Sequence, residues 1–322
     1  MSADRARSAW LAFAWLLVAG AAFAADPSKT PQPLDAPTIE TLLEADGEPA
    51  SRQQALREVV ARAQAGEAWA AYLLGALYRS GMDHPARLVE RDPDTARHWL
   101  MRCVGSAGCP LLALASLAEL ELAERQAKPA MQWAQAWVVL DRELAERLRA
   151  TDAPASTGLR ELMRTSYHAY LVERCYALME GSQAERDAQG LAWFNELRAL
   201  HGTALDRMFF AALDERTDLV APVDQGLEPS AENQRRRTID GNAPAPRQPA
   251  LGVYLYRGNP AGGPAEAVQT IEALPNPMKS FGLRTLARSL RTKPYPATAG
   301  ERRYAILPLS FGQSDYYLFD PD

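Results

Sequence analysis

The sequence predicts a mainly α-helical fold in which helical-hairpin repeats precede a small α+β region with the order strand, strand, helix, strand. Three observations support this prediction. Residues 71–81 and 92–100 carry small and aromatic side chains at the spacing of two packed helices. Residues 26–224 are rich in Ala, Leu, Glu and Arg, most of which favour helices. Residues 250–322 are rich in Tyr, Pro, Gly and β-branched residues, which are typical of strands and turns.

Residues 1–25 are expected to be a signal peptide. Two arginines precede an apolar run at residues 9–19, and Ala-Phe-Ala at 22–24 is the small-x-small pattern that signal peptidase cleaves. Cleavage would begin the mature chain at Ala25 or Asp26 and leave no stable membrane span. Because the apolar stretch is close to the minimum length that crosses a bilayer, an inner-membrane anchor is the alternative.

Three helices are predicted next. The stretch 51–65 begins at a suitable N-cap, Ser51, and has its apolar residues on one face. The following two helices form a hairpin, in which Gly81 ends the first helix and Asp92 caps the second ahead of Pro93. The residues expected to pack this hairpin are Ala71, Leu74, Gly75, Tyr78, Gly81, Ala96 and Trp99.

The alanine and tryptophan of this hairpin recur further along the chain. Ala130 and Trp133 follow Ala96 and Trp99 at an offset of about 34 residues, the length of one helical-hairpin repeat. In stacked hairpins the small alanine lets two helices approach, and the indole fills the groove between them. The four residues therefore predict repeated packing of the same kind.

These residues resemble the Sel1-like repeat family, a relative of the tetratricopeptide repeats. Hairpins of that family carry an alanine, a Leu-Gly-x-x-Tyr motif and then Ala-x-x-Trp. Residues 66–108 match this pattern, residues 111–139 keep the tryptophan half, and residues 187–202 repeat an alanine and a tryptophan ahead of a glycine. The resemblance implies an α-solenoid that presents a concave groove to other proteins. The alternative is a non-repeating all-α domain in which the tryptophans fill the core.

The three cysteines are too few for a fold built on disulfides. Cys103 and Cys109 can form a disulfide if one helix ends near the first and the next begins just after the second. Cys175 would then be a buried, inert thiol. Bridges from Cys175 to either of the other two cysteines are the alternatives.

A polar, proline-containing linker is expected at residues 225–249, between a helical repeat domain at 26–224 and an α+β domain at 250–322. In the second domain, residues 251–258, 265–274 and 304–311 alternate in the manner of strands. The segment between the last two strands has leucines at helical spacing with arginines outside them. Pro308 cannot donate to a sheet, so the last strand is expected at an edge or at a bulge.

The sequence from Leu251 to Phe311 resembles the C-terminal domain of TonB-type energy transducers. The resemblance rests on the order of its expected elements and on the run from Phe281 to Phe311. In it a helix of leucines and arginines leads into Lys-Pro-Tyr-Pro-Ala, a glycine turn and an apolar strand. The resemblance implies a strand edge that accepts an extended peptide. By analogy the docking strand would comprise Arg303, Tyr304, Ala305, Ile306, Leu307, Leu309 and Ser310. The family's polar anchor helix and long spacer are missing from the sequence, so energy transduction itself is not expected.

Catalytic and cofactor-binding motifs are missing from the sequence. The four histidines, His84, His98, His168 and His201, fall in no metal-ligand spacing. No Walker loop, Gly-x-Ser-x-Gly or Gly-x-Gly-x-x-Gly motif occurs. We therefore expect no catalytic residue, no cofactor and no metal, and expect the chain not to be an enzyme. An unrecognised hydrolase is the alternative, which a cleft lined by polar groups and a histidine would support.

The charge distribution gives no indication of a nucleic-acid partner. Acidic residues outnumber basic ones in 26–224, whereas basic residues are in slight excess in 246–322, and the net charge of the whole chain is −5. This asymmetry is too weak to favour nucleic acid. The sequence therefore predicts a non-catalytic periplasmic or secreted adaptor that binds a protein or peptide partner. The alternative from another class is a membrane-tethered, TonB-like accessory of an outer-membrane transport or envelope system.

Overall fold

The computed structural model describes residues 34–151, 157–215, 227, 230, 249–278, 280–296 and 301–311, and only the backbone at residues 151, 157–165, 281 and 311. The predicted signal peptide and most of the predicted linker lie outside these residues. The described fold is mainly helical and contains a small three-stranded antiparallel sheet, in agreement with the predicted fold class. The type of the helical repeat stays a prediction.

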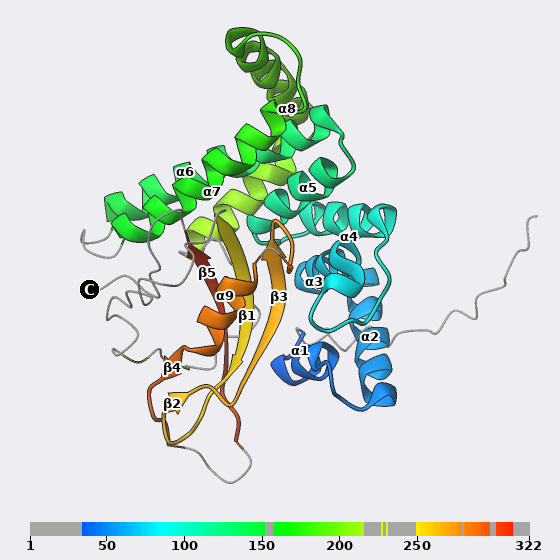
Figure 1. Cartoon of the computed structure of the whole chain (residues 1–322), viewed down its shortest axis with the longest axis vertical. Helices are drawn as coiled ribbons and strands as arrows, with labels where there is room; N and C mark the ends of the chain where they lie inside the picture. The colour runs from blue at the N-terminus through cyan, green and yellow to red at the C-terminus, as the bar shows by residue number, and fades with distance from the viewer. Residues whose placement is uncertain are drawn as a thin grey trace, which may run out of the picture. The chain divides into compact units, whose positions relative to one another are not determined.

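Eight α-helices precede the sheet among the described residues (Figure 1). They are α1 (Ala36–Leu43), α2 (Pro49–Gln64), α3 (Ala68–Ser80), α4 (Pro93–Gly105), α5 (Leu112–Ala123), α6 (Ala127–Thr151), α7 (Thr157–Tyr176) and α8 (Gln183–Asp214). A short 3-10 helix, η1 (Gly81–Asp83), follows α3. No helix of this part of the chain is both long enough and apolar enough to cross a membrane.

The hairpin of α3 and α4 forms where the sequence predicts it. Asp92 caps α4 by accepting hydrogen bonds from the backbone N–H groups of Asp94 and Thr95, and Pro93 occupies the first turn. Gly75 lets the two helices approach, because a Cβ at this position would lie 2.6 Å from Cγ of Leu100. Gly81 has a φ of 57°, so the chain leaves α3 through a conformation that suits glycine.

The residues predicted to pack the hairpins belong to the core. Trp99 and Trp133 are buried, and so are the alanines three residues before each of them. Tyr78 is half-buried, while Ala71, Leu74, Gly75 and Gly81 are buried. Small residues and indoles therefore fill the contacts between helices, as the pattern indicates.

The sheet has the strand order β3-β1-β5 and is antiparallel throughout. Its strands are β1 (Ala250–Arg257), β3 (Ala267–Leu274) and β5 (Tyr304–Phe311), which lie within two residues of the predicted strands. Two short strands, β2 (Gly263–Pro264) and β4 (Arg291–Thr292), pair with each other, and α9 (Phe281–Arg288) precedes β4. In this sheet β5, which contains Pro308, is an edge strand, as expected.

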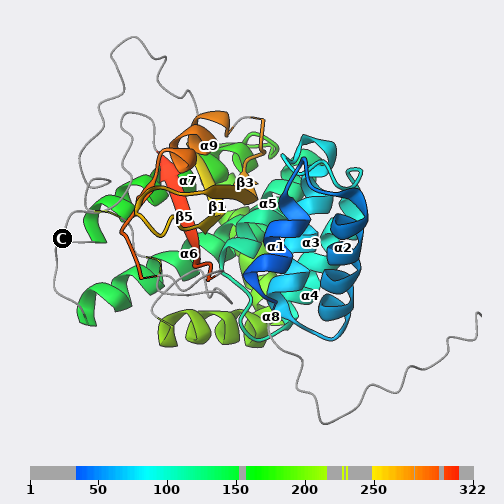
Figure 2. The ribbon, with the colours of Figure 1, turned by 90° about the horizontal axis from the view of Figure 1, so that it is seen from below.

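The side chains of the sheet alternate between two cores. Tyr254 and Tyr256 of β1 pack with Leu283 and Leu286 of α9. Val253 and Leu255 belong instead to the same core as the helices. In Figure 2, α9 lies above the strands and α6 below them, while α1 and α3 lie beside β3. The regions that the sequence assigns to separate helical and α+β domains therefore share one hydrophobic core in the structure.

Candidate functional site

Buried charges join the helices to the sheet. Arg79 of α3 is buried and forms an ion pair with Glu272 of β3, and it also donates hydrogen bonds to the backbone oxygens of Ala273 and Pro275 at 2.9 Å. Burial alone would lower the pKa of Arg79, but the charge of Glu272 raises this pKa above its usual value. The second carboxylate oxygen of Glu272 accepts a hydrogen bond from Ser116 Oγ at 2.7 Å.

Two further buried carboxylates have partners of the same kind: Glu119 joins two helices, and Glu40 joins a helix to the sheet. Glu119 of α5 accepts hydrogen bonds from the hydroxyl of Tyr167 and from Arg174, both at 2.6 Å. Glu40 of α1 accepts hydrogen bonds from Arg257 at 2.7 Å and from the hydroxyl of Tyr304 at 2.9 Å. Since the three carboxylates are buried and all have partners, they hold the elements together and leave little room for a ligand.

His84 lies near Arg79 and is kept neutral. It is buried, and its Nδ1 accepts a hydrogen bond from the backbone N–H of Ala86 at 3.1 Å. The pKa of His84 is lowered to about 4, chiefly by burial. Backbone hydrogen bonds at Ile271 and Thr270 partly oppose this effect, and the nearby charge of Arg79 adds to it. The imidazole therefore acts as a structural acceptor at neutral pH.

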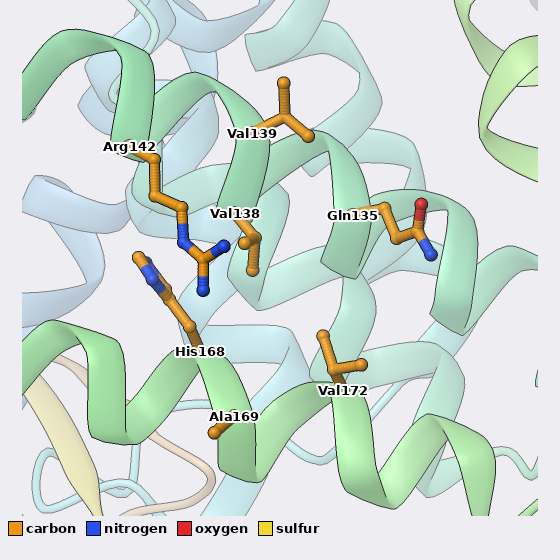
Figure 3. A pocket seen from close by; sticks show the side chains of 7 residues that line it. All are labelled: Gln135, Val138, Val139, Arg142, His168, Ala169 and Val172. Atoms are coloured by element: carbon orange, nitrogen blue, oxygen red, sulfur yellow. The ribbon is translucent and has the colours of Figure 1, made fainter. Parts of the chain in front are cut away.

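An open groove lies between α6 and α7 and has a volume of about 300 Å³. Figure 3 shows that α6 contributes one wall and α7 the other. The lining residues are Gln135, Val138, Val139 and Arg142 from α6, and His168, Ala169 and Val172 from α7. Most of these side chains are aliphatic, so the groove offers an apolar surface with a few polar groups, as ligand-binding clefts commonly do.

Helical periodicity places these residues in facing rows. The four residues from α6 recur at the three- and four-residue spacing that puts side chains on one face of a helix. Val139 is 44% exposed. Helix α8 lies against the end of the groove at Gln135. A Cβ atom at Gly190 of α8 would lie 2.9 Å from the side-chain nitrogen of Gln135.

His168 forms part of the groove wall with a buried carboxylate behind it. Its Nε2 lies 2.9 Å from Oδ2 of Asp141, and both side chains are 3% exposed. The ring packs edge-on against Trp137, with centroids 4.6 Å apart. A histidine oriented by an aspartate can serve as a general base, but none of the described lining residues carries a hydroxyl or thiol nucleophile.

Arg142 is the one arginine that lines the groove. Its side chain is exposed and points toward His168 in Figure 3. It forms no ion pair or hydrogen bond with any residue that the structure describes, whereas nearby Arg147 pairs with Glu143 at 2.8 Å. Among the described residues, the groove thus presents a cation without a carboxylate partner beside apolar walls.

Apart from His168, the residues singled out from the sequence are not among the residues that line this groove. Cys103 and Cys109 form a disulfide between α4 and α5, and Cys175 is a buried free thiol whose pKa burial raises to about 12. The four histidines do not come together, and no group of described histidines, cysteines, aspartates and glutamates has the arrangement of a metal site.

The strand predicted to dock a peptide is mostly turned inward. Tyr304, Ala305, Ile306 and Leu309 are buried, while Arg303, Leu307 and Ser310 are half-buried. A peptide could therefore meet this strand only through its backbone edge. The groove is not among the features predicted from the sequence, although the stripe at residues 135–142 indicates a partly apolar helix face.

Comparison with protein-family models, with curated proteins and with solved structures finds no match for this chain. The likenesses to Sel1-like repeats and to the TonB C-terminal domain therefore stay resemblances of sequence pattern. Function is inferred from the geometry of the groove.

Proposed function

We propose that this chain is a non-catalytic adaptor that binds a peptide or protein segment in the groove between α6 and α7. The observation that carries the proposal is an open, mainly aliphatic groove of about 300 Å³ in which Val139 remains 44% exposed. Two facing helices with such walls can accept the apolar face of a helix or a short extended segment. Burial of this surface would provide the free energy of binding.

The proposed location is the periplasm or the extracellular space, after signal cleavage. The signal-like segment 1–25 supports it, and so does the Cys103–Cys109 disulfide, since disulfides persist mainly in oxidising compartments. The alternative is the membrane-tethered accessory, in which segment 1–25 is retained. Mass spectrometry of the native N-terminus separates the two, because a start at Ala25 or Asp26 leaves no tether.

A second binding mode uses the backbone edge of β5. Within the described sheet β5 pairs with β1 on one side only, which favours the addition of an extended peptide strand on the other. In this mode the backbone of residues 303–310 provides the hydrogen bonds. A hydrolase remains the candidate from another class, and the His168–Asp141 pair is the feature that favours it.

The test selects peptides from a random library with the mature chain and measures their affinity by fluorescence anisotropy. Val139→Asp and Val172→Asp each place a charge on the apolar wall, and we expect each to weaken binding at least tenfold, about 1.4 kcal/mol. Leu200→Asp is the matched control, because Leu200 is 78% exposed on α8 and does not line the groove. It should leave affinity unchanged.

Two outcomes would overturn the groove as the binding site. Affinities that are the same for Val139→Asp, Val172→Asp and the unmodified chain would assign binding elsewhere. Weakening by Ile306→Pro, which removes a backbone donor of β5, with no effect of the valine variants, would favour the strand edge. Turnover of a peptide that is lost in His168→Gln would instead support the hydrolase.

A further inference from the structure

We propose that residues 312–322 of this same chain occupy the groove between α6 and α7 and compete there with the external ligand. This inference deepens the proposed function and rests on it, because the groove must be a binding surface. It assigns the groove a resident occupant of defined chemistry, an aromatic segment flanked by carboxylates.

The chemistry of segment 312–322 complements that of the groove. Its sequence, GQSDYYLFDPD, places four consecutive large apolar residues, Tyr316 to Phe319, between Asp315 and Asp320. Such a run gains free energy when an apolar surface covers it. The aliphatic walls formed by Val138, Val139 and Val172 provide that surface.

The charge of Arg142 also favours segment 312–322 as the occupant of the groove. Arg142 lines the groove without an ion-pair partner among the described side chains. An aspartate at either side of the aromatic run can supply the missing carboxylate, and an aromatic face can also pack on the guanidinium. The guanidinium of Arg142 is therefore complementary to both the carboxylates and the aromatic rings of segment 312–322.

The segment follows a strand that packs against α7, the helix that forms one wall of the groove. It follows β5, which ends at Phe311 and packs against α7 (Figure 1). Helix α7 has 20 residues and is therefore about 30 Å long. The eleven residues of segment 312–322 can extend to about 36 Å, so any position along α7 lies within their reach.

The test uses the full mature chain with the photo-cross-linker p-benzoylphenylalanine in place of Phe319. After irradiation at low protein concentration, mass spectrometry should map the principal cross-links to residues 135–142 and 168–172. Arg142→Glu should reduce their yield about tenfold. The same photo-cross-linker in place of the exposed Leu200 is the control and should give no cross-link to these residues.

Mixing light and isotopically heavy chains distinguishes a second copy from the same chain. Cross-links confined to chains of one isotope support the proposal. Cross-links that join light and heavy chains, or that map only outside the groove, overturn it. The result does not depend on whether an external peptide has been found.

Deletion of residues 312–322 provides an independent readout. A selected peptide that binds the groove should bind the deleted chain about tenfold more tightly, because the apparent Kd is reduced when the competing occupant is removed. An unchanged Kd, with binding still sensitive to Val139→Asp, would refute the internal occupant and leave the proposed function intact. Cross-links in the groove, with no peptide bound by the deleted chain, would refute the proposed function alone.

Discussion

Arg79 is a long cationic side chain that the fold buries almost completely, and it is tolerated because Glu272 and two backbone oxygens surround its charge. Glu119 and Glu40 follow the same rule, each with an arginine and a tyrosine hydroxyl as partners. A buried pair of this kind adds little net stability compared with apolar residues, but breaking it leaves an uncompensated charge. The pairs of Glu272 and Glu40 join helices to the sheet, whereas the partners of Glu119 join α5 to α7.

Glu272→Gln should destabilise the fold by about 3–5 kcal/mol, because the charge of Arg79 then remains buried without its partner. The measurement is the free energy of unfolding in urea. Asp94→Asn is the control, since Asp94 pairs with Arg97 at the surface and its side chain is 95% exposed. The control should cost under about 0.5 kcal/mol. Similar small losses for both variants would contradict a tightly buried pair.

His84 makes stability depend on pH. Its pKa in the folded state is about 4, against 6.5 as the ordinary value, so the unfolded chain binds more protons between these two values. The contribution of neutral His84 is complete above pH 6.5 and is lost as the pH falls toward 4. The loss amounts to roughly 3 kcal/mol.

The measurement compares the unmodified chain with His84→Asn in urea at pH 4.5 and pH 7. We expect the stability advantage of the unmodified chain to be clearly smaller at pH 4.5. An equal difference at both pH values would show that His84 does not titrate in this way.

At the scale of the element, helix packing depends on tryptophans at equivalent places. Trp99 of α4 and Trp133 of α6 are both buried, and each follows a fully buried alanine at the same spacing. The alanine brings the helices together, and the indole fills the space beside it. The burial of these four residues agrees with their expected packing, while the relation of the two helices as successive repeats stays a prediction.

Trp99→Ala should lower the free energy of unfolding by about 3–5 kcal/mol, the usual cost of removing a buried aromatic side chain. The neighbouring His98→Ala, at an exposed position of the same helix, should change stability little. Chemical denaturation of both variants, followed by circular dichroism, measures the difference. An unchanged midpoint for Trp99→Ala would contradict its packing role.

The strands could be predicted from sequence because their pattern is local. Alternating apolar residues at 304–311 predicted the bounds of β5, and Pro308 predicted an edge position or a bulge, of which the structure shows the edge position. The pair formed by Arg79 and Glu272 could not be predicted, since the two residues are 193 apart in the sequence and meet only when the sheet packs on α3. The groove was missed for the same reason, because its walls come from two helices whose orientation the sequence pattern does not give.

At the scale of the whole molecule, helices and sheet share a core. Val253, Leu255 and Ile306 of the sheet belong to the same buried cluster as residues of α1, α3 and α5. The sequence pattern separated these regions because their compositions differ. Composition reports local structure, however, and not which surfaces later pack together.

Ile306→Ala tests this shared core. It should cost about 2–5 kcal/mol and shift the unfolding of helices and sheet together. Tryptophan fluorescence follows the helices, since the described tryptophans all lie there, and hydrogen exchange of β1 follows the sheet. Coincident midpoints are expected. A shift of the β1 transition alone would mean that the two regions unfold as independent domains.

Valine methyl NMR can show whether the groove between α6 and α7 is a binding surface. A selected peptide is titrated into the methyl-labelled full chain. We predict saturating shifts at Val138, Val139 and Val172, with little change at Val59 and Val104, which are buried in α2 and α4. Saturable binding that leaves the three groove valines unshifted would contradict the claim.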